Sequence, residues 1–248
     1  MTGNGVYVYA IVRAGQRAPA ELSGVGSPPL PLRVLVEGRL GAVVSDAPPK
    51  LRARRRDLLA HQDVLLWLTG SGPTLPMRFG MVAPDEEAVR SELTAAEHRH
   101  HTVLKRLDGR VEVNVKAFVP SDALAPLVQE DKNIQRLHEA ARRHPGYEAN
   151  LRLGEAVATA LSRRAAEAGQ RAVQELTPLA HAVAAGPQVP GCVLNTSFLI
   201  DSAADGRFRA AAQDFAALRQ DRVELRVAGP LPCYSFVEAG GALAGAGA

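Results

Sequence analysis

The sequence has few cysteines, few aromatic residues and almost no excess of charge of either sign. Its two cysteines cannot build a disulfide framework, and a chain of 248 residues can bury a core without one. Aromatic residues make up 4% of the chain, which argues against the stacking platforms that bind single-stranded nucleic acids. The 29 Lys and Arg residues nearly balance the 26 Asp and Glu residues, so composition gives no case for a strongly basic nucleic-acid binder.

Long hydrophobic runs are also absent. No stretch of about 18 apolar residues occurs, so we expect no transmembrane helix. The segment from Met1 to Gly5 has no basic start followed by an apolar run, and we expect no secretory signal. A hydrophobic fraction of 46% and a charged fraction of 22% are typical of a globular protein with one large domain or two small ones. The expected location is the cytoplasm, where thiols stay reduced.

The first 119 residues predict more strands than helices. Val6 to Val12 is β-branched and aromatic, as in a strand that is buried on both faces. Two short apolar runs on either side of Gly38-Arg39 predict a hairpin. The other predicted elements are a helix over 54–69, a strand over 74–82 that Pro76 weakens, a helix over 84–107 and a strand over 111–118. This order predicts an α+β domain with a mixed or antiparallel sheet and with helices on one face.

From Pro120 the composition shifts to Ala, Arg and Glu, which favour helices. Helices are predicted over 125–143 and 149–176, and the second restarts at Thr177-Pro178 and continues to Gly186. A strand over 192–200, a helix over 208–219 and an alternating strand over 222–227 follow. We therefore predict an N-terminal α+β domain at 1–120, a helix-rich C-terminal α+β domain with an extended aromatic tail at 121–237, and a disordered Gly/Ala tail at 238–248.

The histidines are the first candidates for catalysis or metal binding. His61 lies on the apolar stripe of its helix with Leu58. It is either a catalytic base or a histidine at the edge of the core that bonds to backbone, and the second interpretation is favoured. His98 and His101 lie three residues apart on a helix, which is half of a metal site, but no further ligand has the required spacing. We predict no metal and no cofactor.

The remaining chemistry-bearing motifs are weak. Cys192 begins an apolar strand and is interpreted as an inert thiol, and nothing near Cys233 indicates activation. The glycine-rich run Ser23–Gly26 lacks the helix and the Lys of a phosphate-binding loop. The basic run Arg52–Arg56 is typical of a solvated face, and its alternative is contact with nucleic acid or an acidic partner.

One segment is unusual for a strand. Leu75–Gly80 places Pro, Arg and Gly between apolar residues. Arg78 is flanked by Met77 and Phe79, and a guanidinium in such a setting is costly to desolvate without partners. Arg78 is therefore predicted to anchor backbone carbonyls or a carboxylate. A second strand, Val193–Asp201, has three small polar residues in its middle.

The C-terminal segment Gly229–Val237 is also unusual. Pro230 and Pro232 hold it extended, so that Tyr234 and Phe236 lie on one side of it. Two aromatic residues on a rigid segment predict docking in a pocket, either between the chain's own two domains or on a partner.

Together these segments carry a resemblance to a known family. The chain resembles the gas vesicle protein family GvpF/GvpL nearly from end to end. The matching segments, in order, are Tyr7–Val12, Ala42–Ser45, His61, Leu75–Gly80, Val113–Lys116, Asn150–Glu155, Leu194–Asp201 and Gly229–Val237. Met81 and Cys233 depart from the residues that the family usually has there, Thr and Pro.

The resemblance implies a two-domain α+β protein whose sheets have a ferredoxin-like arrangement. It also implies a non-enzymatic role in building gas vesicles, as an assembly or minor shell-associated protein in the gas vesicle and the cytoplasm. The implied partners are the hydrophobic shell protein GvpA and other accessory Gvp proteins, with no nucleic acid and no lipid membrane. Arg78, Phe79, Tyr234 and Phe236 are the candidate structural or partner-contact residues. The alternatives are an enzyme that uses His61 and Arg78, or a nucleic-acid-binding regulator that uses Arg52–Arg56.

Overall fold

The structure, a computed structural model, describes residues 5–237 and divides into two compact units. Unit 1 comprises residues 5–112 and 230–237 of the described chain, and unit 2 comprises residues 113–229. The sequence placed the boundary at Pro120 and assigned the C-terminal segment to the second domain. The contacts instead divide the chain inside a strand and group the C-terminal segment with unit 1, because its side chains bind there. The tail predicted at 238–248 lies outside the described residues.

Unit 1 is a sheet with three helices. In chain order its elements are β1 (Val6–Arg13), β2 (Arg33–Glu37), β3 (Leu40–Asp46), α1 (Arg55–Ser71), β4 (Thr74–Pro76), β5 (Val82–Ala83), α2 (Glu86–Ala95) and α3 (Glu97–Leu107). The strands lie in the order β2-β3-β1-β4, with β5 also paired to β1, and the β1, β2 and β3 pairings are antiparallel. The predicted hairpin is confirmed as β2 and β3.

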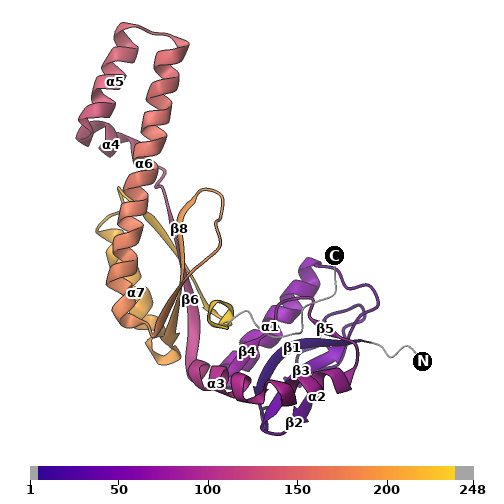
Figure 1. The fold of residues 1–248 in the computed structure, drawn as a ribbon. Coiled ribbons are helices and arrows are strands. Elements are labelled where there is room, and N and C mark those ends of the chain that lie inside the picture. The colour runs from indigo at the N-terminus through magenta and orange to yellow at the C-terminus, as the bar shows by residue number, and fades with distance from the viewer. Residues whose placement is uncertain (1–4, 238–248) are drawn as a thin grey trace. The chain divides into compact units, whose positions relative to one another are not determined.

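β1 lies between β3 and β4 in the sheet (Figure 1). It is buried on both faces, as predicted. A bulge between Val8 and Ala10 interrupts its alternation, so Tyr9 and Ala10 point to the same face. That face packs against α1, whereas the opposite face, with Val8, packs against α2 and α3. The prediction of helices on one face was therefore wrong, because β1 has apolar side chains for a helix layer on each side.

Two predicted elements of unit 1 are divided in the structure. The strand over 74–82 becomes β4 and β5, and the turn between them includes Gly80 at a φ of 91°. The helix over 84–107 becomes α2 and α3, which meet at Ala96. Asp85 caps α2, since its side chain accepts a hydrogen bond from the backbone N–H of Ala88 at 2.8 Å.

Unit 2 has a four-stranded sheet and a long helix. Its elements are β6 (Arg110–Phe118), which begins in unit 1, then α4 (Leu124–Glu130), α5 (Lys132–Arg143), α6 (Tyr147–Leu176), β7 (Ala182–Ala185), β8 (Cys192–Asp201), α7 (Asp205–Ala217) and β9 (Glu224–Leu231). The strand order β7-β8-β6-β9, with α6 between β6 and β7 and α7 between β8 and β9, is the βαββαβ order of ferredoxin-like folds. The structure therefore places the ferredoxin-like arrangement in unit 2, whereas unit 1 begins with three successive strands.

Small residues allow α6 to approach the sheet of unit 2 closely. Ala168 and Ala172 of α6 share a buried cluster with Ala117 of β6 and Phe215 of α7. A Cβ atom at Gly169 would lie 3.0 Å from the Cβ of Ala117, so a larger residue here would require the helix or the strand to shift.

Two elements of unit 2 differ from the prediction. The residues Ala182–Ala185, expected to continue a helix, form β7 and pair with β8. The helix over 125–143 is divided at Asp131, whose carboxylate caps α5 by accepting hydrogen bonds from the N–H groups of Asn133 and Ile134. No helix within residues 5–237 is long and apolar enough to cross a membrane.

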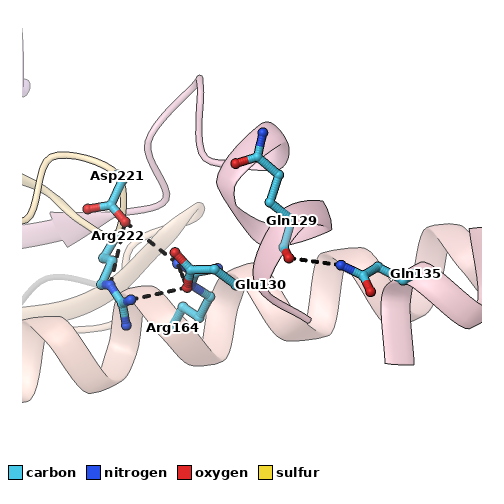
Figure 2. Close-up of polar contacts among 6 residues, drawn as sticks. All are labelled: Gln129, Glu130, Gln135, Arg164, Asp221 and Arg222. Atoms are coloured by element: carbon cyan, nitrogen blue, oxygen red, sulfur yellow. Dashed lines mark hydrogen bonds and ion pairs between the residues drawn. The ribbon is translucent and has the colours of Figure 1, made fainter. Parts of the chain in front are cut away.

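A cluster of charged side chains connects α4 and α6 to the segment before β9 (Figure 2). Arg164 of α6 lies 3.0 Å from Glu130 and 3.6 Å from Asp221. Arg222 contacts the same Glu130 carboxylate at 3.1 Å. Near it, the Gln135 side chain donates a hydrogen bond to the carbonyl of Gln129 at 2.8 Å. These contacts join α4 to α5, to α6 and to the segment before β9.

Candidate functional site

The inner face of α1 positions His61 against β1. His61, Val64, Leu65 and Leu68 recur at helical spacing and are all buried. The imidazole of His61 stacks on Tyr9, with ring centroids 5.5 Å apart, and meets the edge of Tyr7 at 5.7 Å. Leu58, seven residues before Leu65, projects in nearly the same direction as Leu65, as predicted, but it is 42% exposed.

Both nitrogen atoms of His61 are engaged. Nε2 lies 3.1 Å from the carbonyl oxygen of Met77, and Nδ1 lies 2.9 Å from the hydroxyl of Tyr7. A carbonyl only accepts, so we assign the proton to Nε2, which leaves Nδ1 to accept from Tyr7. Burial lowers the pKa of His61 to about 4, against the smaller opposing effect of its bond to Met77. His61 is therefore neutral at pH 7 and matches the favoured interpretation, a histidine that bonds to backbone.

The turn between β4 and β5 is held by this network. The N–H of Met77 donates to the carbonyl of Tyr9 at 2.8 Å, and the N–H of Gly80 donates to the Tyr7 hydroxyl at 3.2 Å. Phe79 packs edge-on against His61, with centroids 5.8 Å apart. Arg78 occupies the turn with an exposed side chain, and the structure gives this guanidinium no ion pair among the described residues. The predicted anchoring of Arg78 to carbonyls or a carboxylate is thus not observed.

The C-terminal segment also reaches His61. The hydroxyl of Tyr234 lies 3.2 Å from Nε2, beside the Met77 carbonyl. Burial raises the pKa of Tyr234 to about 12. The segment is extended only to Leu231, and a 3₁₀ turn from Tyr234 to Phe236 follows. The prediction of a fully extended tail was therefore wrong.

Further contacts of the C-terminal segment bind it to the start of β6 and to α3. The backbone N–H and the hydroxyl of Ser235 both donate to the carboxylate of Glu112, at 2.9 and 2.7 Å. Phe236 is buried, and its carbonyl accepts a hydrogen bond from Arg106. The aromatic tail thus packs within the chain's own unit 1, whereas the sequence predicted docking between the two domains or on a partner.

Sequence reasoning missed Tyr7 and Glu112 as parts of this site. Tyr7 had been assigned only to a buried strand, and its hydroxyl now connects His61 to Gly80. Glu112 is 5% exposed although it is charged. The sequence did contain a signal for Glu112, because it lies between two valines of β6. A carboxylate whose sequence neighbours are buried in a core needs a hydrogen-bond partner.

This arrangement of side chains stabilises the fold of unit 1 and offers no group for proton transfer. His61 has no nitrogen free to act as a base, and burial raises the pKa of Tyr7 and Tyr9, which keeps both phenols protonated. Asp57, one turn before His61, is already used, since its carboxylate accepts from the N–H of Gly26 at 3.0 Å. The exposed Arg78 does not join His61 in a pocket, so the geometry does not provide the enzyme site considered above.

Metal and thiol chemistry find no support in the described part of the chain. Residues 5–237 contain no group of three or more His, Cys, Asp or Glu side chains placed to hold a metal. His98 is exposed and His101 is partly buried on α3, whereas His100 is buried. Burial raises the pKa of Cys233 to about 12, with a smaller contribution from Glu112, so this thiol is protonated and unreactive at neutral pH.

A second surface of unit 1 lies on the outer side of α1. Leu59 and Trp67 are 46% and 39% exposed there. The arginines that precede and begin the helix are exposed as well. The sequence had indicated the basic run but not the apolar side chains next to it.

Comparisons with known proteins identify the family. The model of the family described as "Gas vesicle synthesis protein GvpL/GvpF" matches residues 5–238. The chain is 42% identical to gas vesicle protein F of Streptomyces sp. (strain CB03234) over 94% of this chain and 99% of that protein. It is 33% identical to gas vesicle protein L of the same strain, over 93% of this chain and 91% of that protein.

A solved structure shares the fold. The crystal structure of the gas vesicle protein GvpF from Anabaena sp. PCC7120 superposes with a TM-score of 0.76 at 24% identity, over 96% of this chain and all of that one. The predicted α+β fold class is confirmed. The family model and the Streptomyces relatives together show that the chain belongs to the GvpL/GvpF family of gas vesicle synthesis proteins, which take part in gas vesicle formation.

Proposed function

We propose that this chain binds the gas vesicle shell protein GvpA and other accessory Gvp proteins while the vesicle is built, and that it acts by binding and not by catalysis. The observation that carries this proposal is the family match over residues 5–238. A hydrophobic shell subunit aggregates unless its exposed surface is covered before assembly, and a binding protein provides that cover. The engaged, neutral His61 supports a role without proton transfer. The proposed locations are the gas vesicle and the cytoplasm.

The candidate residues are assigned different roles within this proposal. Phe79, Tyr234 and Phe236 support unit 1, because their rings or hydroxyl groups pack on His61 or lie in the core. Arg78 is the residue that contacts a partner, because it is exposed on a turn that the network holds rigid. Because the backbone of this turn is already held, binding there costs little backbone entropy.

Co-purification with the shell protein tests this function. The tagged chain is expressed with the other gas vesicle proteins, and GvpA is measured in the eluate and in washed intact vesicles. We expect Arg78→Ala to melt at an unchanged temperature and to retain less GvpA. Arg207→Ala, an exposed arginine of α7, is the matched control and should retain as much as the parent. Absence of any Gvp protein from the parent eluate would overturn the proposal.

We also propose that the two units are separate domains. Ser121 and Asp122 are exposed just after Pro120, and the segment 15–31 contains no helix or strand. Limited proteolysis should therefore cut first near Pro120 or within 15–31. Mass spectrometry of the early fragments checks this, and early cuts within α1 would contradict it.

A further inference from the structure

The outer side of α1 carries more apolar surface than the fold of unit 1 uses. Leu59 and Leu66 lie seven residues apart and therefore project in nearly the same direction from the helix. Trp67 adjoins Leu66, and the side chains of Leu59 and Trp67 are 46% and 39% exposed. The inner side uses other residues, including Val64, Leu65 and Leu68.

Such a concentration is unusual for a helix with one side in water. Single exposed leucines are common, but neighbouring large apolar side chains on one short helix form a patch of the kind that binds other molecules. Trp67 is the only tryptophan of the chain, and tryptophan is enriched where protein surfaces make their strongest contacts. This patch, the α1 patch, consists of Leu59, Leu66 and Trp67.

Arginines adjoin the α1 patch at one end. Arg52, Arg54, Arg55 and Arg56 are all exposed, and Arg55 lies one turn before Leu59 on the same side of the helix. Cations at a helix N-terminus oppose the helix dipole, so helix stability does not explain them. Within residues 5–237 the structure pairs neither Arg52 nor Arg55 with a carboxylate, whereas Arg56 lies 3.4 Å from Asp57.

We propose that the α1 patch and its arginines bind an amphipathic helix of a partner protein, with acidic residues at the end that faces Arg52 and Arg55. The inference rests on the proposed function, which it deepens by naming the chemistry of the partner. The apolar stripe of such a helix would cover Leu59 and Leu66 as one helix packs on another. Its carboxylates would pair with the free guanidinium groups.

An acidic lipid surface also attracts arginines, but Asp63 disfavours it. Asp63 is exposed and lies midway between Leu59 and Trp67, at four residues from each. Insertion of the patch into a bilayer would carry this carboxylate toward anionic headgroups and away from water. A partner helix instead accommodates Asp63 with one lysine or arginine opposite it.

Trp67 provides a direct measurement. The probe is a synthetic amphipathic helix of about 18 residues with a leucine stripe, glutamates at one end and no tryptophan. We expect the emission of Trp67 in the full-length protein to shift to shorter wavelength and to saturate as this peptide is added. Leu59→Ser and the double variant Arg52→Glu/Arg55→Glu should each weaken binding about tenfold or more. Leu218→Ser, an 80% exposed leucine in unit 2, should bind as the parent does.

The controls decide between the explanations. All substituted side chains are exposed, so each variant should melt as the parent does. An unchanged Trp67 emission, an equal response to a peptide with lysines in place of glutamates, or a response only to vesicles of phosphatidylcholine and phosphatidylglycerol would each overturn the inference. If Leu59→Ser still retains GvpA and the accessory proteins as the parent does, the α1 patch is not the surface that binds them. The inference then fails while the proposed function stands. If the parent retains no Gvp protein, the proposed function fails, and the peptide titration alone decides the inference.

Discussion

Unit 1 and unit 2 use polar interactions in different places. In unit 1, His61, Tyr7 and Glu112 are buried and find their partners inside the core. In unit 2, Glu130 and Arg222 of the charged cluster are both at least 40% exposed, and only Arg164 of that cluster is largely buried. Removing one partner from a buried pair leaves the other without water, whereas an exposed partner is solvated again. Unit 1 should therefore be fragile toward single changes and toward acid, and unit 2 tolerant of them.

The largest difference should follow removal of the C-terminal segment. A chain that ends at Gly229 loses the burial of Phe236 and leaves the Glu112 carboxylate without its two donors. We expect a loss of about 5 kcal/mol in the stability of unit 1. Denaturant unfolding followed by Trp67 emission reports on unit 1 alone, with a chain that ends at Val237 as the reference.

Should the shortened chain fail to fold, Tyr234→Phe and Phe236→Ala keep this prediction testable. Phe236→Ala should cost about 3 kcal/mol or more, and Tyr234→Phe about 1 kcal/mol. Normal unfolding of both variants would show that the segment does not stabilise unit 1.

The next largest effect concerns His61. His61→Ala leaves the Met77 carbonyl and the Tyr7 hydroxyl without their partner and opens a cavity against Tyr9. We expect a loss of about 3–4 kcal/mol, again from Trp67-monitored unfolding. His181→Ala, in an exposed pair 2.7 Å from Asp201 in unit 2, should cost less than about 1 kcal/mol. Equal costs at the two sites would remove the contrast between the units.

Acid should destabilise unit 1 more than unit 2. Burial lowers the pKa of His61 and of His100 from 6.5 to about 4, with a further lowering of His100 by Arg99. Between these values the unfolded chain binds protons that the folded chain does not, so the free energy of unfolding of unit 1 decreases as pH falls from about 6.5 to about 4. The contribution of His61 is about 3 kcal/mol. Unfolding at several pH values checks the slope, and His61→Gln should make it shallower.

The smallest effect is expected in unit 2. Arg222→Ala removes contacts to Glu130 and Asp221 that are open to solvent. We expect a loss of about 0.5 kcal/mol, which disappears in about 1 M salt because screening already weakens the pair. Circular dichroism follows it, since the thirty-residue helix α6 dominates the signal of unit 2. A loss as large as that of His61→Ala would contradict the comparison.

Local patterns in the sequence predicted most of the elements. β1, the β2–β3 hairpin and β8 follow from apolar composition and turn residues close in the chain. β7 was missed because Leu176, Leu179 and Val183 keep the spacing of a helix, and only pairing with β8 makes Ala182–Ala185 a strand. The division at Asp131 did have a local signal, since Asp is a favoured cap.

The candidate site was less predictable, because it joins distant parts of the chain. His61 bonds to residues 54 positions before it and 173 positions after it. Periodicity placed His61 on an inner face and gave it a backbone partner in general terms, but did not identify Tyr7 or Tyr234. For Arg78, apolar neighbours in sequence indicated burial, whereas its side chain is exposed on the turn that includes Gly80, and its role stays a prediction.

The insertion of unit 2 between Glu112 and Pro230 sets the order in which the molecule is completed during synthesis. A ribosome releases residues from the N-terminus onward, so all of unit 2 emerges before Tyr234 and Ser235. Unit 1 is therefore begun first and completed last, and until then Glu112 lacks its two donors. A chain that stops anywhere before residue 230 has a complete set of residues for neither His61 nor Glu112, so a closed unit 1 marks a polypeptide that has been translated at least through Ser235.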